Sequence, residues 1–379
     1  MMRSPVQQDA ANRLSIRLWS AEEFSAARTI WDELLRRSDA DPLFMSWDWQ
    51  WRWWEHHGRS LEAKLLLVAV YRGAGLIGLA PFYVHRAHVR GVLHPRRLQL
   101  LGTAWRDPRA AFSDYLDILA DRDARDWVLR GVADWLQVAP WDDLVLCCLR
   151  RGGIADRLAR DYLPALAAVR EVDPLTGWRA PLPASFDEFL ERLAPDVRRR
   201  LFNQRRKLRN PRLRAADASD IDCDLDQLWC YAGSRWGSGG GRSASQGFYR
   251  DLARHALQAG QLRLTRLETD DGTLSVMFNV SVANCVYYLQ SGFDSDASGG
   301  ISPGYLHFGY AIENACSECA DYFDFLGGIG RTRDYKRDLL TENVPLVTYH
   351  AVRGAFARGL YRSYDLWRRA IRHLGSSSG

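Results

Sequence analysis

Residues 285–336 read CVYYLQSGFDSDASGGISPGYLHFGYAIENACSECADYFDFLGGIGRTRDYK, and the order of strand and helix signals in this stretch decides the fold. Cys285–Ser291 is rich in aromatic and β-branched side chains and runs into a glycine, which predicts a strand that ends in a turn. The Ser-Pro-Gly of Ser302–Gly304 is typical of a helix start, because serine caps backbone N–H groups and proline is tolerated in the first turn. Tyr322–Leu326 predicts a second strand. The stretch is therefore a strand–helix–strand unit.

This unit predicts where a ligand binds. If the two strands are parallel, as a crossover helix implies, their C-terminal ends and the helix N-terminus share one edge of the sheet. Asp294, Ser302–Gly304 and Gly327-Gly328 would meet at that edge, where ligands of α/β sheets bind. The free N–H groups and partial positive charge of a helix N-terminus suit a phosphate. An ordinary capped helix without a ligand is the alternative.

The composition is that of a folded globular chain. Its 379 residues suffice for two domains, and 47% of them are hydrophobic. No run approaches the roughly 18 apolar residues of a membrane span, and residues 1–14 lack the apolar core of a secretory signal. The seven cysteines show no paired spacing, and Cys316 and Cys319 lack the histidines that usually complete a zinc site. We therefore expect a cytoplasmic protein without a metal or a transmembrane segment.

The first half of the chain repeats the same order. Tyr115–Leu149 predicts strand, helix and strand, and each unit follows a hairpin whose second strand reads GLIGLAPFYV or GTLSVMFNV. The repeat suggests a duplicated domain, and the proline-rich segment Val172–Pro183 marks the boundary. We predict an α/β fold with mixed sheets, made of residues 1–178 and residues 179–379. Because carboxylates precede the first helix and would repel a phosphate, the predicted anion site lies in the second domain.

A strongly basic segment follows the boundary. Residues 196–214 read DVRRRLFNQRRKLRNPRLR and set nine positive charges against one carboxylate. The pattern is consistent with a solvated helix face or with a helix that binds phosphates. In the second case Arg205, Arg206 and Arg209 would hold the phosphates.

Two other segments carry functional expectations. Arg235–Gly247 reads RWGSGGGRSASQG and predicts a flexible loop, in which Trp236 would anchor a lid. Tyr349–Leu374 predicts a closing helix rich in arginine and aromatic residues, which could lie on another domain or make a peripheral membrane contact.

Lysine is rare in this chain. Only three of the 51 basic side chains are lysines, at positions 64, 207 and 336. Where most positive charges are arginines, a retained lysine suggests a need for a small amine that can lose its proton. Lys336 lies just beyond the predicted ligand edge and could hold a phosphate or stabilise developing negative charge.

Seven segments together resemble the CelD/BcsL-type acetyltransferase-like proteins, relatives of the FemAB peptidyltransferases within the N-acetyltransferase (GNAT) superfamily. They read DPLFMSWDWQWRWWEHHG, GLIGLAPFY, RRLQLLG with DYLDIL, RRRLFNQRRKLRN, YYLQSGFD, SPGYLHFGYAI, and YFDFLGG with DYK, and they span almost the whole chain. The resemblance implies two tandem GNAT-like domains, the first of them non-catalytic. It also implies acyl transfer from acetyl-CoA, another acyl-CoA or an acyl carrier protein to an amine or hydroxyl of a small molecule, a saccharide or an envelope precursor.

The chemistry of acyl transfer assigns candidate roles. Asp324 would be the general base if burial raises its pKa, Tyr288 would donate a proton, and Lys336 would stabilise charge. Tyr287 and Tyr288 alternate faces, so at most one of them can line the cleft. The donor-binding candidates are Ser302, Pro303, Gly304, Arg205, Arg206 and Arg209, and the substrate-binding candidates are Tyr287, Asp294, Trp236 and Tyr335.

Two other functions remain open. A FemAB-like transferase would use aminoacyl-tRNA, and the basic segment would then contact RNA phosphates. A non-catalytic scaffold for polysaccharide or envelope assembly is favoured by Gly299–Gly304, which stands where GNAT enzymes have an Arg/Gln-x-x-Gly-x-Gly/Ala loop for pyrophosphate. None of these functions involves DNA.

Overall fold

The computed structural model describes residues 13–88, 94–236, 242–294, 296, 300–327, 335–354 and 359, without the side chains of 234–236 and 242–244. The chain divides into two compact units. Unit 1 comprises Met1–Asp107, Tyr115–Pro174 and Val347–Gly379, and unit 2 comprises Pro108–Asp114 and Leu175–Leu346.

The division between Pro174 and Leu175 falls inside the segment that the sequence predicts as the boundary. The predicted second domain runs from residue 179 to residue 379, whereas unit 2 ends at Leu346 and the chain returns to unit 1 at Val347. The strand β13 (Glu342–Val352) makes this return, and its residues Val347–Val352 are buried. A single cut in the sequence therefore does not separate the two units.

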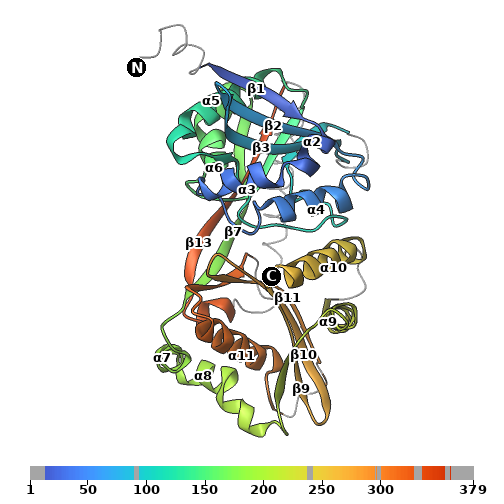
Figure 1. Cartoon of the computed structure of the whole chain (residues 1–379), viewed down its shortest axis with the longest axis vertical. Helices are drawn as coiled ribbons and strands as arrows, with labels where there is room; N and C mark the ends of the chain where they lie inside the picture. Colours follow the sequence, from blue (N-terminus) through green and yellow to red (C-terminus); the bar gives the residue numbers. More distant parts are fainter. Residues whose placement is uncertain are drawn as a thin grey trace, which may run out of the picture. The chain divides into compact units, whose positions relative to one another are not determined.

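Unit 1 is built on a mixed sheet with the strand order β1-β2-β3-β4-β6-β13 (Figure 1). Neighbours from β1 to β4 pair antiparallel, and β6 pairs parallel with β4, with Leu98 opposite Leu144. The short strand β5 pairs with β3. The strands are β1 (Leu14–Trp19), β2 (Lys64–Arg72), β3 (Gly75–Arg86), β4 (Arg96–Leu100), β5 (Leu119–Ala120) and β6 (Asp143–Arg150).

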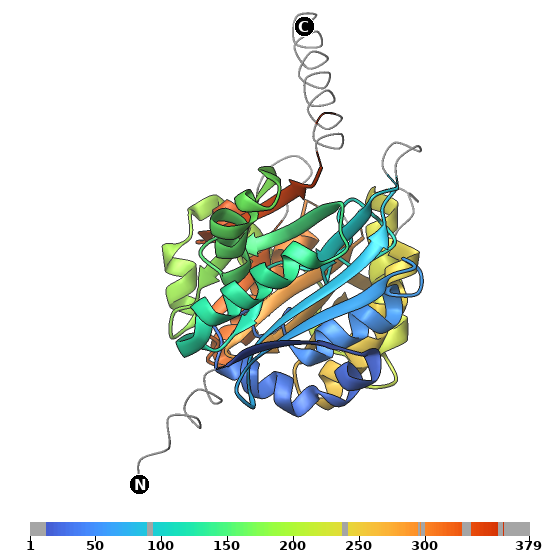
Figure 2. The ribbon, with the colours of Figure 1, turned by 90° about the horizontal axis from the view of Figure 1, so that it is seen from above.

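The helix α5 (Arg125–Val138) lies along one face of the strands β1 to β3 (Figure 2). Two glycines set this close approach. A Cβ atom on Gly78 would lie 2.5 Å from Val128, and one on Gly131 would lie 3.1 Å from Val70. The other helices of unit 1 are α2 (Ala21–Ala26), α3 (Arg28–Arg36), α4 (Trp47–His57) and α6 (Ile154–Arg157), followed by helical turns at Leu158–Tyr162 and Leu163–Ala165.

Unit 2 has the strand order β7-β12-β11-β10-β9-β8. β8, β9, β10 and β11 pair antiparallel in turn, β12 is parallel to β11, and β12 is antiparallel to β7. The strands are β7 (Ala168–Pro181), β8 (Arg212–Ala215), β9 (Leu262–Thr269), β10 (Gly272–Val282), β11 (Cys285–Phe293) and β12 (Tyr322–Leu326), and β7 begins in unit 1.

The helix α11 (Pro303–Ser317) connects β11 to β12 and buries much of its surface in an apolar cluster with Phe323, Phe325 and Leu201. The predicted strand–helix–strand unit, with parallel strands, is thus confirmed. The other helices of unit 2 are α7 (Phe186–Arg192), α8 (Pro195–Leu201), α9 (Ile221–Trp236) and α10 (Arg242–Gln258), with 3-10 turns at Asn203–Lys207 and Tyr335–Asp338.

The two units repeat one order of elements: an antiparallel hairpin, a third antiparallel strand, a helix, and a strand parallel to the third. The predicted repeat is therefore present. Its first parallel strand in unit 1 is β4 (Arg96–Leu100), whereas the sequence placed it at Tyr115–Leu119. In the latter segment only Leu119 belongs to a strand.

Three predicted segments fold differently. The expected basic helix is broken into α8, a 3-10 turn and β8: the α-helix stops at Phe202, which has a φ of −130°, and Asn210, with a positive φ of 51° before a proline, keeps a helix from resuming. The expected loop Arg235–Gly247 is largely the end of α9 and the start of α10, with residues 237–241 outside the described chain. The first residues of the expected helix Tyr349–Leu374 belong to β13, since they continue a β-branched and aromatic run, and residues 360–379 lie outside the described chain. Among the helices that the structure describes, none has the length and apolarity to cross a membrane.

Candidate active site

The strands β11 and β12 separate at the edge that the sequence singled out. Their ladder comprises Cys285–Tyr322, Val286–Phe323 and Tyr287–Asp324, after which β11 runs on to Phe293. A register shift between β10 and β11 leaves one extra residue, Leu289, in β11 just past this point. Such a bulge bends a strand away from its neighbour. The residues of β11 beyond the last pair therefore no longer pair with β12, and their backbone groups on that side can meet a ligand.

The start of α11 lies at the same edge. Its N-cap, Ser302, makes no side-chain cap, and its backbone N–H donates to Oε1 of Gln204 at 3.0 Å. The Nε2 of Gln204 donates to the carbonyl of Gly300 at 3.1 Å. Gln204 belongs to the 3-10 turn of the basic segment, so the structure brings this segment to the helix start, as expected of a phosphate site.

Pro303 occupies the first turn of α11, and Gly304 follows it against the end of β11. A Cβ atom on Gly304 would lie 3.3 Å from the ring of Phe293. The glycine therefore permits a close approach of helix and strand, and a β-carbon would fit with only a small adjustment of that ring.

The three candidate phosphate ligands differ in their surroundings. Arg205 forms an ion pair with Glu313 at 2.6 Å and lies 3.6 Å above the ring of Tyr310, so it is held along the side of α11. Arg206 is exposed, and Arg209 is exposed at 3.8 Å from Asp271. The guanidinium of Arg205 therefore already has aromatic and carboxylate partners, whereas those of Arg206 and Arg209 reach the solvent.

Asp324 is fully buried, which was the condition for a role as general base. Its Oδ2 atom accepts hydrogen bonds from Nε and Nη2 of Arg179 at 2.8 and 2.7 Å, and its Oδ1 atom accepts the N–H of Leu326 at 2.8 Å. The ion pair with Arg179 and the hydrogen bond from Leu326 fix the position of this carboxylate. The geometry therefore supports an orienting role for Asp324 at the end of β12.

Lys336 is 5% exposed, and its ammonium points back at β12. Nζ donates to the carbonyl oxygens of Phe325, Leu326 and Gly327 at 2.7, 3.1 and 2.8 Å. Leu326 has a φ of 57°, so the chain turns sharply at the residues whose carbonyls accept these hydrogen bonds. An ammonium has three donors, and these carbonyls can use all of them. The geometry supports a structural role for Lys336 better than phosphate binding.

The predicted tyrosines separate as alternation along a strand requires. Tyr287 is buried, whereas Tyr288 is half-buried on the side of α11, with its ring centroid 4.9 Å from that of Phe308. The hydroxyl of Tyr288 lies 2.8 Å from Oγ of Ser291. Tyr335 packs on the same aromatic group, 5.8 Å from Phe308. Tyr288 and Tyr335 thus line one wall of the edge.

Two other substrate candidates lie at the ends of elements. Asp294 follows β11, and its Oδ1 accepts the N–H of Asp296, so it closes a turn. Trp236 is the last residue of α9, and its side chain lies outside the described chain. Among the described residues no group of three or more His, Cys, Asp or Glu side chains is arranged to hold a metal ion.

Gln204, Arg179 and His307 were missed by the sequence analysis. Gln204 is an uncharged residue in a basic run, and Arg179 lies 145 positions from Asp324, so neither stands out as a signal. His307 is fully buried in α11, with its ring nitrogens 2.7 Å from Oγ of Ser275 and 2.8 Å from Oγ1 of Thr265. Burial lowers the pKa of His307 to about 3, so the ring is neutral and links α11 to β9 and β10.

Residues 195–337 match a family model described as an acetyltransferase (GNAT) domain. This segment is similar to the GNAT acetyltransferase domain. The matched residues include the parted strands, the whole of α11 and Lys336, and the predicted family resemblance is confirmed. No curated protein matches the sequence.

Solved structures with low sequence identity share the fold. The structure entitled "Crystal structure of FemX" is similar with a TM-score of 0.61 and 11% identity, over 92% of this chain and 99% of that chain. The C-terminal domain of a putative lysylphosphatidylglycerol synthetase from Agrobacterium fabrum is similar with a TM-score of 0.51 and 11% identity, over 92% of this chain and 96% of that chain. L-PGS from Bacillus licheniformis is similar with a TM-score of 0.50 and 12% identity, over 93% of this chain and 97% of that chain. The predicted GNAT-like α/β fold is thus confirmed.

Proposed function

We propose that this chain transfers an acyl group from a thioester donor, such as acetyl-CoA or another acyl-CoA, to an amine or hydroxyl of a small molecule, a saccharide or an envelope precursor. The observation that carries the proposal is the separation of β11 and β12 next to the start of α11, inside the residues that match the acetyltransferase domain. A parted strand exposes backbone N–H groups that can polarise the thioester carbonyl.

In this reaction the acceptor nitrogen or oxygen bonds to the carbonyl carbon, and the C–S bond breaks. The acceptor loses one proton and the sulfur leaves as a thiolate that takes up a proton. The hydroxyl of Tyr288, on the aromatic wall and 2.8 Å from Ser291, is our candidate for that proton donor. Arg206 and Arg209 would bind the donor phosphates, and Asp324 with Lys336 would fix the end of β12.

Calorimetric titration with acetyl-CoA tests the donor. We expect Gly304→Val to abolish binding, because the valine side chain would fill the approach to the helix start. We expect Arg206→Gln with Arg209→Gln to weaken binding at least tenfold and to flatten its salt dependence. Arg192→Gln, on an exposed part of α7, is the matched control. Unchanged binding in the first two variants would place the donor elsewhere.

A second candidate is transfer from an aminoacyl-tRNA. The observation that favours it is the exposed row of Arg206, Lys207 and Arg209, which could track an RNA backbone. In this case tRNA would bind with an affinity that falls steeply with salt, and the double glutamine variant would reduce that slope. If neither acetyl-CoA nor tRNA binds, an acyl carrier protein as donor or a scaffold without catalytic activity becomes the better explanation.

A further inference from the structure

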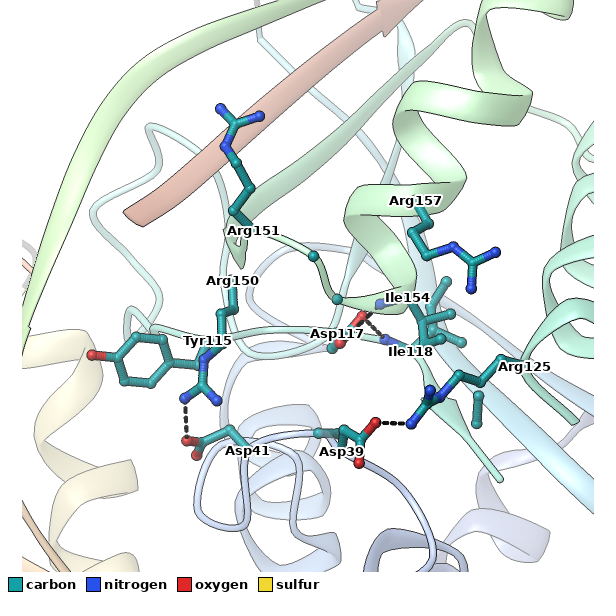
Figure 3. A pocket seen from close by; sticks show the side chains of 14 residues that line it. Asp39, Asp41, Tyr115, Asp117, Ile118, Arg125, Arg150, Arg151, Ile154 and Arg157 are labelled. Carbon is teal, nitrogen blue, oxygen red and sulfur yellow. Dashed lines mark hydrogen bonds and ion pairs between the residues drawn. The ribbon is translucent and has the colours of Figure 1, made fainter. Parts of the chain in front are cut away.

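Unit 1 contains a pocket of about 290 Å³ that the proposed acyl transfer does not use (Figure 3). It lies where β6 ends and α5 begins, the position in unit 1 that corresponds to the predicted ligand edge of unit 2. The volume is at the lower end for small-molecule sites. It is lined chiefly by charged side chains and loop backbone, among them Asp39, Asp41, Asp117, Arg125, Arg150 and Arg157.

The backbone N–H groups of the loop after β6 already have internal partners. The carboxylate of Asp117 accepts the N–H groups of Ile154 and Ala155 at 3.2 and 2.6 Å. The N–H of Gly152 donates to Asp156 at 2.8 Å. Gly153 makes room for this arrangement, since a Cβ atom there would lie 2.5 Å from Oδ2 of Asp117. An anion that enters the pocket must therefore bind to side chains.

Four arginines line the pocket; Arg151 pairs with Glu171 at 3.0 Å, and the other three guanidinium groups are the candidates for binding an anion. Arg125 pairs with Asp39, and Arg157 pairs with Asp126 at 3.0 Å, and all four of these side chains are more than a third exposed. Exposed ion pairs add little to stability, so the guanidinium groups can exchange their carboxylates for a more highly charged anion. Figure 3 shows Arg125 and Arg157 on the same side of the pocket, with the guanidinium group of Arg125 directed at Asp39.

The third guanidinium is fixed from two sides. Arg150 lies 4.9 Å above the ring of Tyr115 and 3.6 Å from the carboxylate of Asp41. Asp41 is itself held by the N–H groups of Leu43 and Phe44, each at 3.0 Å. The Nε of Arg150 is buried and makes no hydrogen bond among the described residues. The side chain as a whole is 38% exposed, so its outer guanidinium nitrogens can meet an acceptor oxygen of a ligand.

We propose that this pocket binds the phosphate group of a small phosphorylated molecule through Arg125, Arg150 and Arg157. Arginine forks match the oxygens of a phosphate, and two or more of them suit its double negative charge. The exposed carboxylate of Asp39 lies beside Arg125, where it can accept hydrogen bonds from hydroxyl groups of the same molecule once the guanidinium turns to the phosphate. A phosphate ester of a polyol or sugar has both features. The residues that line this pocket belong to unit 1 and the donor candidates to unit 2, so this site is separate from the proposed donor site.

Calorimetric titration of the full chain at low salt tests the proposal, with inorganic phosphate, a hexose phosphate and the parent hexose as probes. We expect both phosphate-bearing probes to bind and the hexose alone not to bind. Tighter binding of the hexose phosphate would identify a phosphate ester as the natural ligand, and equal binding would identify free phosphate.

Two variants locate the site. Arg125→Gln with Arg157→Gln should weaken phosphate binding at least tenfold, and Arg157→Gln alone should weaken it severalfold in a protein whose circular dichroism is unchanged. Arg130 is an exposed arginine of α5, the helix of Arg125, and does not line the pocket. The variant Arg130→Gln is therefore the control and should bind phosphate like the parent. No binding of either phosphate probe, or binding that survives the double variant, overturns the proposal. Loss of binding only in Arg206→Gln with Arg209→Gln would assign the phosphate to unit 2 and overturn it as well.

Discussion

Lys336 donates its three N–H groups to carbonyl oxygens at the sharp turn that ends β12. Replacing it with methionine would keep most of the side-chain volume and leave these buried oxygens without their donor. We expect Lys336→Met to lower the free energy of unfolding by about 3 kcal/mol or more, since each unsatisfied buried group costs ~1–3 kcal/mol. Lys64→Met, in an exposed position of β2, should have little effect. Urea denaturation of the two variants decides; equal stability would show that the lysine does not hold the turn.

His307 gives unit 2 a sensitivity to acid. In the folded chain burial lowers the pKa of its ring to about 3, whereas the unfolded chain titrates near 6.5. Above pH 6.5 both states are neutral and the contribution to stability is complete. As the pH falls from 6.5 toward 3, only the unfolded state takes up the proton, so stability is lost at up to about 1.4 kcal/mol per pH unit.

We therefore expect His307→Asn to be less stable than the parent at pH 7.5 and to lose less stability on acidification. The difference between the two free energies of unfolding should shrink as the pH falls below 6.5. Chemical denaturation at several pH values between 7.5 and 4 measures it. Parallel curves for parent and variant would rule out His307 as the titrating group.

At the scale of an element, α11 is fitted to its neighbours by two glycines of different tolerance. A Cβ atom on Gly309 would lie 2.2 Å from the backbone oxygen of Leu201, whereas one on Gly304 would lie 3.3 Å from the ring of Phe293. Backbone cannot move aside as a ring can. We expect Gly309→Ala to destabilise the protein by roughly 2 kcal/mol or more, by analogy with overpacked cores, and Gly304→Ala by less than about 1 kcal/mol. Thermal unfolding of the pair tests this, and equal melting temperatures would contradict it.

The elements that the sequence predicts well are those whose signals are local. α5 (Arg125–Val138) lies where the strand–helix–strand order over Tyr115–Leu149 predicts a helix, because its apolar period and its flanking residues agree. β13 was missed because its β-branched run leads directly into an arginine-rich segment with helical periodicity. The basic segment was extended through Asn210 because charge alone carries no information about where a helix ends.

The candidate site was predictable in place but not in role. The edge of β11, α11 and β12 follows from the order of strand and helix, which any chain of this pattern must obey. The partner of Asp324 is Arg179 from β7, and the partners of Lys336 are backbone oxygens. Neither partner leaves a pattern near the residue itself. The sequence analysis placed no anion site in unit 1 because carboxylates precede its helix. In the structure Asp126 forms an ion pair with Arg157, and Asp121 lies 3.2 Å from Arg37.

At the scale of the whole molecule, unit 1 depends on the last described strand of the chain. Val347–Val352 of β13 are buried in unit 1. The hydroxyl of Thr348 accepts the N–H of Cys148 in β6 and donates to Sγ of Cys147. A chain that stops at Leu346 would expose the edge of β6 and leave apolar side chains uncovered. We expect such a truncated chain to aggregate or to lose the near-ultraviolet signal of the tryptophans of unit 1. A monomeric truncated chain with the parent spectrum would contradict this.

The same strand sets an order of events during synthesis. A ribosome releases the chain from its N-terminus, so the residues of β1 to β6 emerge long before β13. All residues of unit 2 are available for folding once Leu346 has left the exit tunnel. Until β13 follows, the edge of β6 in unit 1 has no strand to pair with. The half of the protein that is made first is thus the half that is completed last. During that interval its exposed edge is the part of the nascent chain that a chaperone would need to shield.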